Sequence, residues 1–135
     1  MFERSIKWIM LICGLLTSAT SYVMFAPEAA LRSALGLPIS SPMALVVVRH
    51  WGALIGLFGL MLIYGAFKDS VRRMVLVTTS AGKAAFIALG LLQGRQFLLS
   101  QAGPGAVIDF IAVLLFATYL ISSRTQGAVE PSLVR

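Results

Sequence analysis

Long apolar runs alternate with short polar segments along this 135-residue chain. A helix needs roughly 20 apolar residues to cross a bilayer, and four runs reach this length, at residues 6–26, 43–67, 72–93 and 105–123. The connections between them are too short to hold a second domain. The pattern therefore predicts an all-α fold, in which residues 1–123 form a single four-helix transmembrane bundle that runs up-down-up-down. Residues 124–135 are predicted to form a flexible polar tail.

The connection between the first two runs has its own periodicity. In PEAALRSALG, residues 27–36, Leu31 and Leu35 lie four positions apart and share one face of a helix. Glu28 and Arg32 share another face. This spacing predicts a short amphipathic helix that lies in the membrane interface.

The first apolar run also resembles a secretory signal, because a basic start precedes it and TSA at 17–19 offers a cleavage site. Its apolar character continues beyond that site to Phe25. We therefore expect a membrane helix that is not cleaved off.

Composition and charge add a topology to this outline. Charged residues make up 12% of the chain, against about 25% in soluble domains. The net charge of +6 would suit nucleic acid, but most basic residues fall on one side of the predicted membrane. That side has Arg4, Lys7, Lys68, Arg72, Arg73, Arg124 and Arg135, and the other connections have only Arg32 and Arg95. By the positive-inside rule, we expect both termini on the cytoplasmic side of a bacterial inner membrane. The predicted surroundings are membrane lipid and no nucleic acid.

Charged and polar residues inside the apolar runs are the candidate functional residues. They are Arg49, His50, Lys83, Asp109 and Gln93. An unpaired charge at the bilayer centre costs about 2.5–3.5 kcal/mol, so we predict that the two cations and the aspartate share one network in the outer half of the bundle. Within it, we predict that Arg49 and Asp109 form a coupled pair.

This network has two interpretations, which the sequence leaves open. Its excess positive charge would attract an anionic ligand, and the cluster would then be a binding site. Alternatively, Arg49 and Asp109 form an ion pair that only holds two helices together, while Lys83 reaches into a wet crevice.

A stripe of small residues lies beside Arg49 on the second run. Gly52, Gly56 and Gly59 share one helical face, and such stripes let two membrane helices approach closely. They are predicted to be packing residues rather than ligand-binding ones.

The common catalytic and cofactor patterns are missing from the sequence. It has no HExxH, P-loop, GxGxxG or GxSxG motif. One histidine cannot form a multi-histidine metal site, and the single Cys13 excludes an internal disulfide. We therefore predict no metal and no cofactor, and no reaction can be assigned.

Several segments together resemble the DoxX-like superfamily of small four-helix bacterial membrane proteins. They are EAALRSALGLPISSP, the glycine-rich RHWGALIGLFGLMLIYGAF, AGKAAFIALGLL and DFIAVLLFATYL. The resemblance covers about residues 5–123 and implies a four-helix bundle in the cytoplasmic membrane. Some members of that superfamily take part in quinone-dependent sulfur oxidation or in redox complexes. With only Cys13, this chain lacks the thiol pair that thiol redox chemistry would need.

Three functions remain as hypotheses. The first is an accessory or structural membrane subunit without catalysis of its own, which works with other membrane subunits or as a homo-oligomer. The second is binding of a quinone headgroup or an anionic metabolite by the polar cluster. The third is an oligomeric transporter or channel, because four short helices enclose little volume by themselves.

Overall fold

The computed structural model describes residues 2–35, 41–92, 94, 99 and 102–129, and most of these residues are helical. The helices are α1 (Phe2–Ala19), α2 (Tyr22–Phe25), α3 (Pro27–Leu35), α4 (Pro42–Phe67), α5 (Asp69–Leu92) and α7 (Ala102–Val129). Four stretches are long and apolar enough to cross a membrane: Arg4–Phe25, Pro42–Phe67, Asp69–Leu92 and Gly103–Ser123. The chain is therefore an all-α, multi-pass membrane protein, as predicted.

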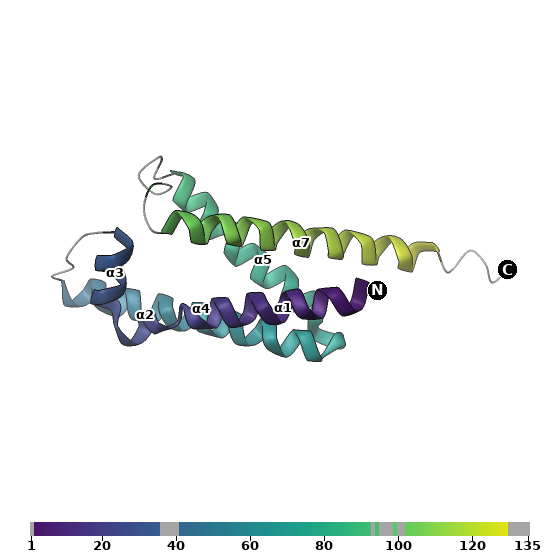
Figure 1. Cartoon of the computed structure of the whole chain (residues 1–135), viewed down its shortest axis with the longest axis horizontal. Coiled ribbons are helices and arrows are strands. Elements are labelled where there is room, and N and C mark those ends of the chain that lie inside the picture. The colour runs from purple at the N-terminus through teal and green to yellow at the C-terminus, as the bar shows by residue number, and fades with distance from the viewer. Residues whose placement is uncertain (1, 36–40, 93, 95–98, 100–101, 130–135) are drawn as a thin grey trace.

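The four long helices form an up-down-up-down bundle. The start of α1, the junction of α4 with α5 and the end of α7 lie at one end of the molecule (Figure 1). The short helix α3 lies at the opposite end. We refer to these as the terminal end and the α3 end.

The first crossing is interrupted, which the apolar pattern did not predict. Residues Thr20 and Ser21 form a turn between α1 and α2. The Thr20 hydroxyl donates to the carbonyl of Thr17 at 2.6 Å, and the backbone N–H of Ser21 donates to the carbonyl of Ser18 at 3.0 Å. Hydroxyl side chains compete in this way with regular helical hydrogen bonds, so the polar TSATS segment breaks the helix.

Helix α3 has the amphipathic character that its spacing predicts. Pro27, Ala30 and Leu31 are buried, whereas Glu28 and Arg32 are exposed. The helix contacts both α2 and the beginning of α4. It thereby closes one corner of the bundle at the α3 end.

Several helix ends differ from the predicted spans, as those of α5 and α7 show. Helix α5 begins at Asp69, directly after Lys68, because the polar residues that precede the apolar run are also helical. Helix α7 begins at Ala102 and continues to Val129, into the segment predicted to be a loose tail. The end of α7 is consistent with the proline at position 131, because a proline disfavours helical geometry in the residue before it.

The helices pack as two pairs that α5 connects. Helix α1 lies along α4, while α7 packs chiefly on α5, which also contacts α4 and runs obliquely across the molecule (Figure 1). The buried apolar core is near the terminal end and consists of Ile6, Met10, Leu62, Ala66, Val75, Leu76, Ala112 and Phe116. The helices are therefore held together most firmly at that end.

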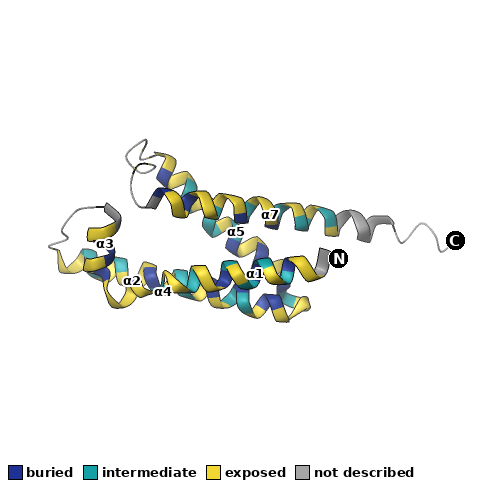
Figure 2. Ribbon diagram, in the orientation of Figure 1, coloured by how far each residue is buried: buried dark blue, intermediate teal, exposed yellow. Residues whose placement is uncertain are grey.

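Much apolar surface remains uncovered. The chain exposes 9452 Å², whereas a soluble globular protein of this mass exposes about 6,900 Å². At most 22% of the most apolar stretch of each crossing is buried, and exposed positions follow all the long helices in Figure 2. Only lipid or further protein can cover such a surface favourably.

Candidate functional site

An ion pair crosses the interior of the bundle between α5 and α7. The Lys83 ammonium pairs with the Asp109 carboxylate and also donates to the Thr17 hydroxyl of α1 at 3.3 Å. The Lys83 side chain is 10% exposed and that of Asp109 is 24% exposed. One cation thus joins three helices in a region where an unpaired charge would be costly.

More polar side chains lie next to this pair. Cys13 is one turn before Thr17 on α1, is half-buried and packs against the edge of the core. Thr79 is one turn before Lys83 on α5 and is 1% exposed. Its hydroxyl has no hydrogen-bond partner among the described residues, and neither has that of Ser80. The ion pair therefore lies in a polar layer just above the apolar core.

The structure separates Arg49 from this layer. Arg49 is exposed on α4 and forms no hydrogen bond or ion pair with the described part of the chain. The predicted pair of Arg49 with Asp109 is therefore wrong. The reason is that α7 packs chiefly on α5, so that Lys83 of α5 is the cation beside the carboxylate.

The two remaining candidates also stay outside the polar layer. His50 is exposed on α4 and forms no hydrogen bond within the described residues. Gln93 lies outside the described residues. Of the five candidates, the structure therefore brings together only Lys83 and Asp109.

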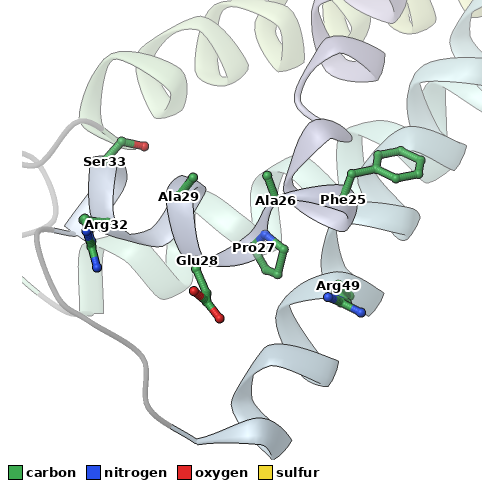
Figure 3. A pocket seen from close by; sticks show the side chains of 8 residues that line it. All are labelled: Phe25, Ala26, Pro27, Glu28, Ala29, Arg32, Ser33 and Arg49. Atoms are coloured by element: carbon green, nitrogen blue, oxygen red, sulfur yellow. The ribbon is translucent and has the colours of Figure 1, made fainter.

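Arg49 instead lines an open pocket at the α3 end. This pocket has a volume of about 700 Å³ and is bounded by Phe25, Ala26, Pro27, Glu28, Ala29, Arg32, Ser33 and Arg49. Figure 3 shows the acidic side chain of Glu28 between the two arginines in this view. With two cations and one anion, the pocket has a formal charge of +1. The apolar lining residues come from the end of α2, from the α2–α3 junction and from α3.

The glycine stripe of α4 packs within the chain. A Cβ atom at Gly52 would lie 2.5 Å from the backbone nitrogen of Met24. One at Gly59 would lie 2.6 Å from the backbone nitrogen of Ser18, and one at Gly56 would lie 2.9 Å from the Ser21 Cβ. Contacts this short are possible only for glycine, so the stripe lets α1 and α2 approach α4 closely.

A second stripe of small residues is exposed. Thr78, Ala81, Ala85 and Ala88 lie within one 80° sector of α5, at 100° per residue, and all four are exposed. We call this the alanine face. The exposed bulky residues Met74 and Leu92 lie in the same sector, before and after these four, so the alanine face covers only residues 78–88. The exposed positions of α7 include the bulky residues Val107, Ile108, Ile111, Leu114 and Leu115.

A buried arginine at the terminal end is not predicted from the sequence. Arg72 is 5% exposed, although the charge pattern indicates only the side of the membrane on which it lies. Its guanidinium donates to the carbonyls of Gly65 at 3.3 Å and Ala66 at 3.1 Å, and it pairs with Asp69. It thereby satisfies carbonyls in the last turn of α4, where cations are favourable. Its position three residues after Asp69 was the available signal.

Comparison with known protein families, with characterised proteins and with solved structures finds no match for this chain. Within the described residues, no three His, Cys, Asp or Glu side chains lie close enough together to hold a metal ion. The pocket, the polar layer and the alanine face are therefore the features that bear on function.

Proposed function

We propose that this protein is a non-catalytic subunit of the bacterial cytoplasmic membrane that pairs with a transmembrane helix of another subunit through the alanine face. The observation that carries the proposal is the exposed stripe of Thr78, Ala81, Ala85 and Ala88. Small residues at this spacing let helix backbones approach closely, and a threonine hydroxyl can donate a hydrogen bond across the contact.

The small size of the residues on this part of α5 supports a protein partner over lipid at this face. Large side chains such as Leu114 and Leu115 on α7 offer lipid a broad apolar surface. Alanines offer little area to lipid chains, but they permit close helix contact and the dispersion energy that comes with it. The chain already uses small residues in this way where Gly52, Gly56 and Gly59 meet α1 and α2.

The interior charges support a structural role. Lys83 is held by Asp109 and Thr17, and Arg72 is held by Asp69 and two carbonyls. Each arrangement ties one helix to another. The proposed topology places both termini in the cytoplasm, on the charge bias of the connections. Membership of the DoxX-like superfamily is part of the proposal and rests on the segments named above.

Photo-crosslinking in native membranes tests the alanine face. A photo-reactive amino acid at Ala85 is expected to give a discrete adduct, and the same residue at Leu114 on α7 is not. An adduct of twice the 14.5 kDa chain would identify a second copy as the partner. Any other discrete mass would identify a different subunit.

A bulky substitution gives the matched control. With the photo-reactive residue at Ala81, Ala85→Leu should abolish the adduct, because the leucine separates the helices. Ala19→Leu introduces the same change at an exposed alanine of α1 and should leave the adduct intact. Equal crosslinking at Ala85 and Leu114, or an adduct that survives Ala85→Leu, would refute the proposal.

A further inference from the structure

We propose that the pocket between α2, α3 and α4 binds the phosphate group of an anionic phospholipid. The charge of Arg49 lies within an apolar crossing. At 1.5 Å per residue, it is about 10 Å from the start of α4. It has no anionic partner among the described residues. A cation at this depth requires a counter-ion or water.

The charges of the pocket select the ligand. Arg32 and Arg49 lie on two different helices and face the same pocket, in which Glu28 is the one acidic side chain among the residues that the structure describes. A guanidinium presents a planar fork of donors that matches the oxygens of a phosphate group. The formal charge of +1 matches a phosphodiester, which carries a single negative charge. The Ser33 hydroxyl already donates to the Ala30 carbonyl at 2.9 Å, so the two arginines are the main donors.

The apolar part of the lining favours a lipid over a soluble phosphate. Phe25 is 78% exposed at the rim, and Ala26, Pro27 and Ala29 also line the pocket. A soluble phosphate would leave these apolar groups uncovered, whereas the glycerol and upper acyl chains of a phospholipid would cover them. The volume of about 700 Å³ is in the usual range for ligand sites, about 300–1,000 Å³.

The position of the pocket agrees with this ligand. It is beside the amphipathic helix α3 (Figure 3). In the predicted topology, this end of the apolar crossings lies where phospholipid headgroups begin. Binding would add a counter-ion for Arg49 and fix α3 against α4. The proposal depends on neither the alanine face nor its partner, since the pocket is formed by other helices.

Lipid titration with native mass spectrometry tests the site. The purified protein in neutral detergent is titrated with phosphatidylglycerol, and with phosphatidylcholine as the zwitterionic reference. An arginine near an anionic lipid surface contributes about 1 kcal/mol to binding, which corresponds to about fivefold in affinity. Arg49→Gln and Arg32→Gln should therefore each weaken phosphatidylglycerol binding about fivefold. Glu28→Gln should strengthen it, because the substitution removes the one competing carboxylate.

Arg73→Gln is the matched control, because it removes an exposed arginine at the terminal end, away from the pocket. It should leave the affinity unchanged. Far-UV circular dichroism of each variant verifies that the helices remain folded. Circular dichroism of wild-type protein supplies the reference.

Three results would overturn the proposal. The first is an equal loss of affinity with Arg73→Gln and Arg49→Gln, which would indicate general attraction to a basic protein. The second is equal binding of phosphatidylcholine and phosphatidylglycerol. The third is binding of glycerol 3-phosphate or inorganic phosphate alone, with the same affinity and the same dependence on Arg49, since the ligand would then be a soluble phosphate.

Discussion

Breaking the ion pair of Lys83 and Asp109 is expected to destabilise the bundle strongly. Removing one partner from a buried pair costs about 3–5 kcal/mol. Here the lysine side chain is 10% exposed and the aspartate 24% exposed. Partial solvation of the carboxylate moderates the loss, so we expect about 3 kcal/mol for either Lys83→Met or Asp109→Asn, at the lower end of that range.

The double variant gives the decisive measurement. Lys83→Met with Asp109→Asn leaves no unpaired charge, so its loss should be no larger than that of one single variant, at most about 3 kcal/mol rather than 6. The coupling free energy is then at least about 3 kcal/mol, which is the upper end for directly interacting residues. The assay is unfolding in a lipid-like detergent, followed by the helical circular dichroism signal.

A parallel cycle serves as its control. Arg49 is exposed and unpaired within the described residues, so Arg49→Gln and Asp109→Asn should have additive effects within about 0.5 kcal/mol. Additive effects of Lys83→Met and Asp109→Asn would refute the reasoning. So would a larger coupling of Asp109 with Arg49 than with Lys83.

Three further predictions concern packing, helix capping and topology. Gly59→Ala should lower thermal stability more than Gly105→Ala, since a Cβ at Gly59 would meet the Ser18 backbone, whereas a Cβ at Gly105 would have no atom within 4 Å; equal melting temperatures would contradict close packing. Arg72→Gln should cost about 1–3 kcal/mol on unfolding by leaving buried carbonyls without a donor, and the exposed Arg73→Gln should cost little. A reporter that is active only in the periplasm should give no signal when fused to the C-terminus, and a strong signal would reverse the proposed topology.

The architecture could be predicted from the sequence because it depends on features of single segments, namely the length of each apolar run and of each connection. Four apolar runs of sufficient length have only one stable form in lipid, the helix, since every backbone polar group must be satisfied. Short connections then force neighbouring crossings to be antiparallel. The α3 helix was likewise predictable, because the spacing of Leu31 against Glu28 and Arg32 defines its faces. The turn at Thr20 and Ser21 was not predicted, although the hydroxyl residues that cause it are visible in the sequence.

The partner of a buried charge was not predictable in the same way. Helical periodicity predicts that Arg49, Lys83 and Asp109 each face other helices, but it carries no information on the order of helices around the bundle. In the structure α5 lies against α7, and that arrangement assigns the carboxylate to Lys83. The burial of Arg72 was not predictable for a similar reason. Only Lys68 separates α4 from α5, and this short connection brings Arg72 against the carbonyls at the end of α4.

The two small-residue stripes show how this limit bears on function. The spacing of the α4 glycines and the spacing of the α5 alanines both predict that another helix can approach closely. The tertiary structure uses the first, since Gly52 and Gly59 meet α2 and α1, and it leaves Ala81 and Ala85 exposed. A small-residue stripe that packs against helices of the same chain contributes to the stability of the fold. A stripe that remains exposed after folding can pack against a helix of another chain. For this reason the proposal of a partner rests on the exposed alanines and not on the glycines.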